Sequence, residues 1–413
     1  MQLQLLAGEA PRVDPRPARV EPWKQFGDGS VRLYHGDCLD VLASMPARSV
    51  DVGITDPPYG IGFMGKEWDT FRPGEAETRI VPNEQIESDN PNLRGRTRAP
   101  ASSPSAVEYD YSLTALRAFQ AWTARWAREV FRVLKPGAHL LVCGAPRSAH
   151  RMVCGLEDAG FEIRDSLAWL FGQGFPKSHN LDDGLGTALK PGHEPIALAR
   201  KPFDGTVEDC VAMYGTGALN IEAVRRSPSS DVGRWPPNVA MDADVAGQLD
   251  AQSGRRVSGA NPPRRRANKF QKVFGTFKGE ASCTPARGAE AGGASRFFFV
   301  AKPSRLERDF GCEDLPHVTP GACTDRVEGS AGLTAYAGAG RSGGGRNFHP
   351  TVKPVALMRW LLALAAPRGG VVLDPFVGSG TTGMACVVDG YPFIGIDERE
   401  LLNDWAVHET SKL

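Results

Sequence analysis

The sequence lacks the features that mark membrane, secreted and metal-binding proteins. Its longest apolar runs, LAWLF and LLALAA, fall well short of the ~18 residues that suggest a membrane span. Its first residues, MQLQLLAGEAPRVDPRP, show neither the basic start nor the long apolar core of a secretory signal. We therefore expect a cytoplasmic protein that begins with a loose tail over residues 1–28.

The cysteines argue against a metal or disulfide-rich protein, and the net charge limits how a polyanionic partner could bind. The eight cysteines are scattered, with no Cys-x-x-Cys pair and no histidine at zinc-ligand spacing, so neither a metal site nor a disulfide framework is predicted. The 48 basic and 48 acidic residues cancel, so a polyanionic partner would need a local basic surface. With 413 residues and 41% hydrophobic content, the chain can bury a large core or two smaller ones.

The first orderly part of the chain, residues 29–172, alternates strands and helices. Residues 31–60 indicate a strand, a turn, a short helix, a strand and a Pro-Pro loop. Apolar residues then recur at three- and four-residue steps from Leu113 to Leu134, after a possible cap at Ser112, and predict an amphipathic helix. The strand AHLLVCGA, another helix and the strand FEIRDSLAWLF follow. This βαβ rhythm predicts an α/β domain with a parallel sheet.

Two stretches interrupt that alternation. Residues 70–110 are dominated by polar and turn residues and predict a flexible loop. Residues 173–295 are rich in Gly, Pro and Arg and show no clear helix–strand alternation, so we expect an inserted recognition region. Residues 296–413 are orderly again near their end: VVLDPF, GSGTTGMACVV and PFIGID indicate strand, glycine loop, helix and strand, a complete βαβ unit.

The glycine loop GSGTTG limits the possible ligands. Gly378, Gly380 and Gly383 follow a strand and precede a helix, and Asp397 ends the next strand, which by itself fits an NAD-binding motif. Asp374, however, ends the preceding strand, where its carboxylate would repel a pyrophosphate. A ligand with a ribose and a cationic end, such as S-adenosylmethionine, would suit both acids. A plain strand-to-helix turn remains the alternative.

The stretch ITDPPYG ends a predicted buried strand with an acid, two prolines and an aromatic ring. The exocyclic amine of adenine is a poor nucleophile, because its lone pair is delocalised into the ring. The Asp56 carboxylate and the Pro57 carbonyl could accept its two hydrogens and direct the lone pair at a methyl group, while the prolines stiffen the backbone and Tyr59 stacks on the base. The alternative is that Asp-Pro-Pro only terminates a strand.

Two segments, GDCLDVLASMPARSVDVGITDPPYG and HPTVKPVALMRWLLALAAPRGGVVLDPFVGSGTTGMACVVDGYPFIGID, resemble the catalytic and cofactor motifs of amino-group DNA methyltransferases. The order, with DPPY before the glycine loop, resembles the β class, and FMGKEWD, WLFGQGFPKS and ALKPGHEPIALARKP resemble its phage and prophage members. This resemblance implies a Rossmann-like, S-adenosylmethionine-dependent methyltransferase sheet with permuted motif order and an inserted target-recognition region.

The resemblance also implies residue roles. Asp56, Pro57, Pro58 and Tyr59 would form the base-binding catalytic motif. The implied cofactor residues are Asp37, Lys353, Pro354, Asp374, Phe376, Gly378, Gly380, Thr381 and Asp397.

The resemblance assigns these cofactor residues to different parts of the cofactor. The segment from Asp374 to Gly380 would hold the methionine part, Asp397 the ribose and Asp37 the adenine. Lys353 and Pro354 would cover the methionine end. DPPY, rather than SPPY, favours adenine as the target over the N4 of cytosine.

A basic stretch offers a surface for DNA. Between Asp250 and Glu280 there are eight basic residues, no acidic one and three interleaved phenylalanines. Such a stretch can neutralise phosphates and stack near a base that leaves the helix, although a solvated loop is the alternative. The candidate DNA-binding residues are Arg264, Arg265, Arg266, Lys269 and Lys272.

These patterns together predict a DNA methyltransferase that modifies the N6 of adenine in double-stranded DNA. They do not determine the oligomeric state, for which a homodimer is a candidate. N4-cytosine methylation, an NAD oxidoreductase and a DNA-binding protein without activity are the remaining alternatives.

Overall fold

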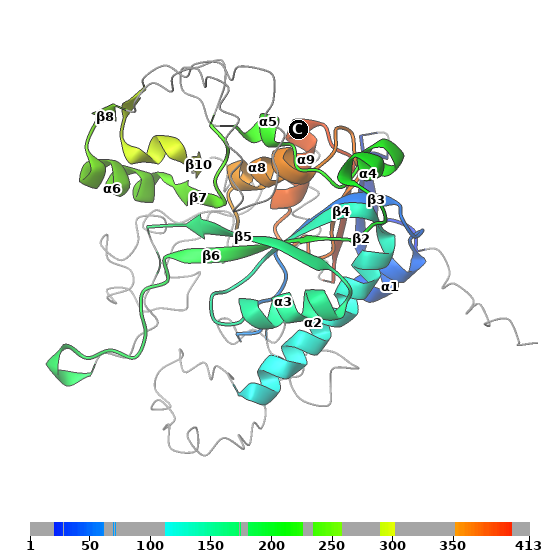
Figure 1. The fold of residues 1–413 in the computed structure, drawn as a ribbon. Coiled ribbons are helices and arrows are strands. Elements are labelled where there is room, and N and C mark those ends of the chain that lie inside the picture. The colour runs from blue at the N-terminus through cyan, green and yellow to red at the C-terminus, as the bar shows by residue number, and fades with distance from the viewer. Residues whose placement is uncertain are drawn as a thin grey trace, which may run out of the picture.

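The computed structural model describes residues 20–27, 29–61, 69, 71, 112–172, 174, 181–225, 234–257, 290–301 and 352–398. Within these ranges, ten strands form one sheet with helices packed on both of its faces (Figure 1). The predicted α/β class is confirmed. None of the helices described is long and apolar enough to cross a membrane.

The sheet strands are β1 (Lys24–Phe26), β2 (Val31–His35), β3 (Val50–Thr55), β4 (Leu134–Cys143), β5 (Glu162–Leu170), β6 (His193–Arg200), β7 (Val239–Asp242), β10 (Phe299–Ala301), β11 (Val372–Asp374) and β12 (Phe393–Asp397). Their spatial order is β1-β2-β12-β11-β3-β4-β6-β5-β7-β10. Two strands pair antiparallel to their neighbours: β1 at the edge and β6 between β4 and β5. The remaining strands all run in one direction, so their carboxyl ends meet at one edge of the sheet.

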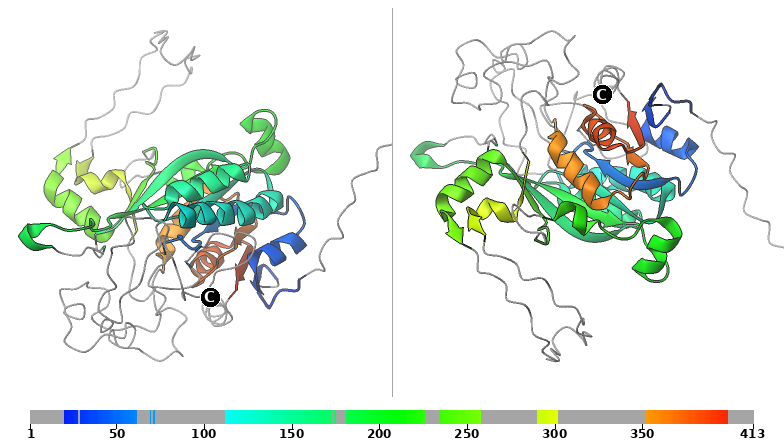
Figure 2. Two further views of the ribbon diagram at one scale, coloured as in Figure 1. Left: turned by 90° about the horizontal axis from the view of Figure 1, so that it is seen from below. Right: turned by 90° about the horizontal axis from the view of Figure 1, so that it is seen from above.

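The helices form two layers. One face carries α1 (Cys38–Ser44), α2 (Leu113–Val133) and α3 (Ala149–Asp158), and the other carries α5 (Ile221–Val224), α8 (Val355–Ala365) and α9 (Thr381–Asp389), as Figures 1 and 2 show. Alternate residues of β4 pack against the two helix layers, because successive side chains of a strand point to opposite faces of the sheet. Leu140 and Val142 join the core beneath α2, whereas Leu141 and Cys143 join the core beneath α8.

The local predictions for the first half hold closely. The Ser112 side chain caps α2 by accepting from the Ala115 N–H at 3.1 Å, as its position before the apolar repeat suggested. Buried positions on α2 recur at helical spacing, which places one face of this helix against the sheet. Helix α2 ends at Val133, and β4 begins directly at Leu134, so this strand includes the Lys-Pro-Gly segment.

The region from 173 to 295 contributes directly to the sheet, which its irregular sequence did not indicate. It supplies β6, in the middle of the sheet, and β7, beside β5. It also contains the short helices α4 (Val207–Tyr214), α6 (Ala243–Ser253) and η3 (Asp182–Gly184), while η4 (Ala294–Phe297) lies across its end. A separate two-stranded ladder joins β8 (Arg256–Val257) and β9 (Ala291–Gly292). Figure 2 shows α6, β8 and η4 together at the β10 end of the sheet.

Candidate active site

Acidic residues gather at the edge of the sheet where the parallel strands end. Asp397 ends β12, Asp374 ends β11, and Asp56 directly follows β3. Because β6 runs antiparallel to β4, its first residues lie at this same edge, and they include Glu194. The two motifs quoted from the sequence, more than 300 positions apart, are thereby brought together on adjacent strands: Thr55 Oγ1 donates to Asp374 Oδ1 at 2.7 Å across a sequence separation of 319 residues.

Both carboxylate oxygens of Asp56 have internal partners. The Tyr59 hydroxyl donates to Asp56 Oδ1 at 2.6 Å, and the Lys353 ammonium donates to Asp56 Oδ2 at 2.8 Å. Lys353 Nζ also donates to the Tyr59 hydroxyl oxygen at 2.8 Å. Lys353 therefore contacts the predicted base-binding motif directly, although the resemblance placed it at the methionine end of the cofactor.

Lys353 is a buried cation between two acids. Its side chain is 7% exposed, and its second carboxylate partner is Glu194, at 3.1 Å. Burial by itself would lower the pKa of Lys353, but the negative charges of Asp56 and Glu194 outweigh this effect and raise the pKa above its ordinary value. Lys353 is thus charged at neutral pH. One of its counter-ions, Asp56, follows β3, and the other, Glu194, belongs to β6.

Tyr59 is held at both ends. Its hydroxyl binds Asp56 and Lys353, and its carbonyl oxygen accepts from the Ser148 hydroxyl at 2.6 Å. Burial, followed by the charge of Asp56, raises the pKa of Tyr59 well above its ordinary value, so the phenol stays protonated and acts as a donor. Asp56 is half-buried and Pro57 is buried, with no cis peptide bond among the described residues.

Asp374 is almost fully enclosed, at 2% exposure. Its Oδ1 accepts from Thr55 Oγ1 and from the Phe376 N–H at 3.0 Å, and its Oδ2 accepts from Thr382 Oγ1 at 2.6 Å. Burial raises the pKa of Asp374 to about 6, despite the hydrogen bonds from Thr382, Thr55 and Phe376 that lower it. Asp374 thus ties the glycine loop to the strand that precedes Asp56.

The glycine loop uses glycine where the backbone requires it. Gly378 and Gly380 have φ values of +50° and +83°, in the left-handed region that other residues rarely adopt, and Gly380 is the N-cap of α9. The Gly378 N–H donates to Asp397 Oδ2 at 2.9 Å, so this acid fixes the loop with one oxygen. Thr381 opens α9 and its hydroxyl lies 3.0 Å from that of Ser379. Residues 378–381 therefore form a fixed loop at the amino end of α9 that can receive a ligand, and we call this loop the cradle.

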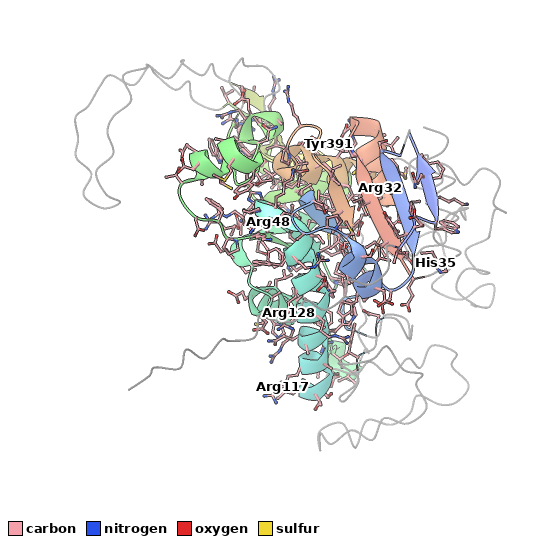
Figure 3. The ribbon with its side chains drawn as sticks, turned by 90° about the vertical axis from the view of Figure 1, so that its right-hand side faces the viewer. Arg32, His35, Arg48, Arg117, Arg128 and Tyr391 are labelled. Carbon is pink, nitrogen blue, oxygen red and sulfur yellow. The ribbon has the colours of Figure 1, made fainter. Side chains whose placement is uncertain are left out.

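Asp37 lies beside this cradle. It caps α1 by accepting from the Leu39 N–H at 2.8 Å, and the adjacent Gly36 N–H donates to the Asp397 carbonyl at 2.9 Å. In the ladder between β2 and β12, Asp397 faces His35, which is labelled in Figure 3 and marks this end of the strands. Asp37, Asp374 and Asp397 thus belong to three neighbouring strand ends.

An aromatic cluster joins the cofactor loop to α2. The Phe376 ring lies 5.4 Å from the Trp122 ring and 5.3 Å from the Trp126 ring. Phe71 in turn lies 4.9 Å from Trp122 and 5.2 Å from Phe119. The predicted cofactor residue Phe376 is therefore fixed by ring contacts with a helix from the other half of the domain.

Two residues of this region were not singled out from the sequence. Glu194 is the first, through its ion pair with Lys353. Asp69, which is fully buried, is the second: its carboxylate accepts from the Gly60 N–H at 2.7 Å and from the Ile61 N–H at 3.3 Å. These two amides directly follow Tyr59, and Gly60, at φ +66°, packs against the Phe119 ring. A lone acid in a polar stretch carries no local signal of such a contact.

A thiol also lies near the acids, at the end of β4. Burial, followed by the charge of Asp56, raises the pKa of Cys143 well above its ordinary value, so it is a neutral thiol and no thiolate nucleophile. The predicted DNA-binding residues Arg264, Arg265, Arg266, Lys269 and Lys272 fall outside the described residues, between β8 and β9.

Sequence comparison matches residues 50–406 to the DNA methylase family of N6 and N4 enzymes. Over 398 residues the chain is 41% identical to the Type II methyltransferase M.ScaI of Streptomyces caespitosus, covering 95% of this chain and 85% of that protein. It is 24% identical over 212 residues to the Type II methyltransferase M.HindIII of Haemophilus influenzae. That match covers 46% of this chain and 64% of the relative, so it spans less than two thirds of the relative's length.

Structural comparison gives more distant similarities. The cytosine-N4-specific PvuII DNA methyltransferase matches with a TM-score of 0.44 and 12% identity, covering 94% of this chain and 87% of that chain. A DNA modification methylase of Thermus thermophilus, TTHA0409, complexed with S-adenosyl-L-methionine, matches with a TM-score of 0.39 and 16% identity, covering 93% and 97%.

Proposed function

The chain belongs to the DNA methylase family of N6 and N4 enzymes, and from this premise we propose that it transfers a methyl group from S-adenosylmethionine to the N6 amino group of adenine in double-stranded DNA. One observation carries the proposal: Thr55, the residue before Asp56, donates to Asp374 at the base of the glycine loop. This bond fixes a group suited to a base amine beside a cradle suited to the cofactor, as direct transfer between two bound ligands requires.

The residues at the strand ends suit S-adenosylmethionine chemically. Asp374 and Asp397 provide carboxylates for a cationic ligand with a ribose, and Gly378 and Gly380 allow close approach of the backbone. Asp37, the N-cap of α1, follows the neighbouring strand β2 and is assigned the adenine end of the same ligand. The bound cofactor supplies an electrophilic methyl group. An NAD oxidoreductase has no support, since the family assignment and the acid at 374 both count against it.

Catalysis by this chain consists of orienting the amine. Asp56 accepts one hydrogen of the target amino group and the Pro57 carbonyl accepts the other, so the nitrogen becomes pyramidal and its lone pair is directed at the methyl group. The nitrogen–carbon bond forms as the sulfur–carbon bond breaks, and the amine then loses a proton to Asp56 or to water. No covalent intermediate on the protein is needed. The base reaches Asp56 by leaving the duplex, with Tyr59 stacking on it.

The finer assignments rest on the resemblance in the sequence. DPPY favours adenine N6 over cytosine N4, its position before the glycine loop favours the β class, and the intervening segments resemble phage and prophage enzymes. The target-recognition region lies within residues 173–295, beside the strands β6 and β7 that this range adds to the sheet. Within it, Arg264, Arg265, Arg266, Lys269 and Lys272 contact DNA phosphates. The enzyme works in the cytoplasm, and a homodimer is its candidate assembly.

The test is to incubate the purified protein with unmethylated genomic DNA and labelled S-adenosylmethionine, and then to identify methylated nucleosides by mass spectrometry. N6-methyladenine is expected. N4-methylcytosine would keep the fold and mechanism but replace the target base. Asp56→Ala serves as the control: it should abolish transfer and leave cofactor affinity largely intact, because this carboxylate binds the base. No transfer by the wild-type protein would overturn the proposal.

A further inference from the structure

The ammonium group of Lys353 is surrounded by three acceptors. It contacts Asp56 Oδ2 at 2.8 Å, the Tyr59 hydroxyl oxygen at 2.8 Å and Glu194 Oε2 at 3.1 Å. An ammonium group has three N–H donors, so these contacts can use all of them and fix its orientation. Two of the acceptors belong to the base-binding motif, whereas the third comes from β6.

The charges around Lys353 are unequal. One cation that is 7% exposed lies between two carboxylates, whose side chains are 20% exposed for Asp56 and 26% exposed for Glu194. If Asp56 were its only counter-ion, Lys353 would neutralise that carboxylate at short range and weaken it as an acceptor for an incoming amine. Because Glu194 is a second counter-ion, Lys353 neutralises Asp56 only in part. The group then keeps a net negative charge where the target amine must bind.

The sheet holds Glu194 in this place rigidly. Glu194 faces Trp169 in the ladder between β5 and β6, and Ile196, two residues later, faces Cys143 in the ladder between β4 and β6. The Gly144 N–H, just after β4, donates to the Pro195 carbonyl at 2.9 Å. Because β6 is antiparallel to both neighbours, its amino end rather than its carboxyl end lies at the active-site edge. A side chain on a central, paired strand is well suited to hold another group in position.

We propose that Glu194 is a positioning residue for methyl transfer: it shares the charge of Lys353 and holds its ammonium group, so that Asp56 remains an effective acceptor for the target amine. This inference rests on the proposed function, since it concerns the same reaction. Glu194 touches neither the base nor the cofactor in this role. Its effect should therefore appear in the rate of the chemical step and not in the affinity for either ligand.

The experiment compares Glu194→Gln and Glu194→Ala with the wild-type protein in single-turnover methylation of unmethylated genomic DNA. Glutamine keeps an oxygen that can accept from Lys353 but removes the charge, whereas alanine removes both. We expect the single-turnover rate to fall about tenfold for Glu194→Gln and about 100-fold for Glu194→Ala, the scale of a misplaced catalytic group. The dissociation constants for S-adenosylmethionine and for DNA should stay within about twofold of wild type, well inside the fold-changes expected for the rate.

A matched control comes from the same pair of strands. Glu162 on β5 forms an ion pair with Arg200 on β6 at 2.7 Å, at the opposite end of the ladder from Glu194. Glu162→Gln should methylate DNA at the wild-type rate, and thermal unfolding of all variants establishes that they are folded. If Glu194→Ala does not fold, Glu194→Gln decides the question.

Three results would overturn the inference. They are a wild-type rate for Glu194→Gln, a loss of ligand affinity that matches the loss of rate, and an equal loss for Glu162→Gln. A wild-type protein that transfers no methyl group would instead overturn the proposed function, so the two failures can be told apart.

Discussion

Thr55 and Asp374 are joined by a 2.7 Å hydrogen bond between the ends of adjacent parallel strands, β3 and β11. Thr55 precedes Asp56, and Asp374 precedes the glycine loop. Both side chains are buried, at 0% and 2% exposure. The distance between the two halves of the active site is therefore set by a side-chain bond inside the sheet, in addition to the backbone ladder.

Thr55→Val should weaken both stability and catalysis. Valine has nearly the shape of threonine but cannot donate, so Asp374 loses one of the three donors that it has among the described residues. We expect a loss of about 1–3 kcal/mol in the free energy of unfolding, measured with urea, because a buried acceptor loses a partner. Methyl transfer should fall as well. Thr55→Ser keeps the hydroxyl and should remain close to wild type in both measurements; equal losses for the two variants would contradict this role for the bond.

Asp374→Asn should change the pH dependence of stability. Burial raises the pKa of Asp374 to about 6 from 3.8, so the folded state binds this proton more tightly than the unfolded state. The contribution of Asp374 to the free energy of unfolding therefore falls as pH rises from about 4 to about 6, by about 3 kcal/mol, and is constant outside that window. Asparagine has no such proton and can keep the contacts to Thr55, Phe376 and Thr382.

The measurement for Asp374→Asn is urea unfolding of both proteins at about pH 4 and about pH 8. The stability of the variant relative to wild type should increase by about 3 kcal/mol between these conditions. A difference that does not depend on pH would show that the pKa of Asp374 is not raised. The affinity of the wild-type protein for S-adenosylmethionine should rise with pH through about 6, because the ionised carboxylate attracts the cationic cofactor.

Tyr59→Phe separates the ring from the hydroxyl. The Tyr59 hydroxyl donates to Asp56 Oδ1 at 2.6 Å, so it competes with an incoming amine for that oxygen. Phenylalanine keeps the stacking surface and frees the oxygen, and we expect the single-turnover rate to stay within about threefold of wild type, the scale of a single neutral hydrogen bond. Tyr59→Ala loses the ring as well and should be much slower. A rate for Tyr59→Phe as low as that for Tyr59→Ala would make the hydroxyl essential and contradict the stacking role.

Local pattern was enough to predict the elements that carry the motifs. The apolar repeat after Ser112 predicted α2, and the succession of VVLDPF, the glycine loop and PFIGID predicted the unit β11, α9 and β12. It also predicted that Asp374 and Asp397 end neighbouring strands. These predictions succeed because period, caps and glycine positions are properties of short segments.

The interior position of β6 could not be predicted in the same way. Its residues His193–Arg200 follow a long irregular stretch, and only pairing with β4 and β5 makes this strand central and antiparallel. Glu194 reaches Lys353 through that pairing. The contact depends on strand order, which the hydrophobic pattern of a short segment does not show. The same reason explains why Lys353, assigned from its motif to the cofactor, was not predicted to bind Asp56.

Asp69 offers a test of how the segment after Tyr59 is held. Its buried carboxylate binds the N–H groups of Gly60 and Ile61 at 2.7 and 3.3 Å. Asp69→Ala leaves two amides without this acceptor, at a cost of about 1–3 kcal/mol for each one that stays buried. The loosened turn should misplace Tyr59 and Asp56, and we expect the single-turnover rate to fall about 10- to 100-fold.

The affinity for S-adenosylmethionine should be unchanged in Asp69→Ala, because the glycine loop is fixed separately by Asp374 and Asp397. Asp69→Asn keeps one oxygen that can accept from Gly60, the shorter of the two bonds, and should recover most of the rate. Isothermal titration with the cofactor and single-turnover methylation distinguish the two effects. If cofactor affinity falls as far as the rate, Asp69 supports the whole site and not the base-binding turn alone; if neither changes, the two hydrogen bonds do not control the position of Tyr59.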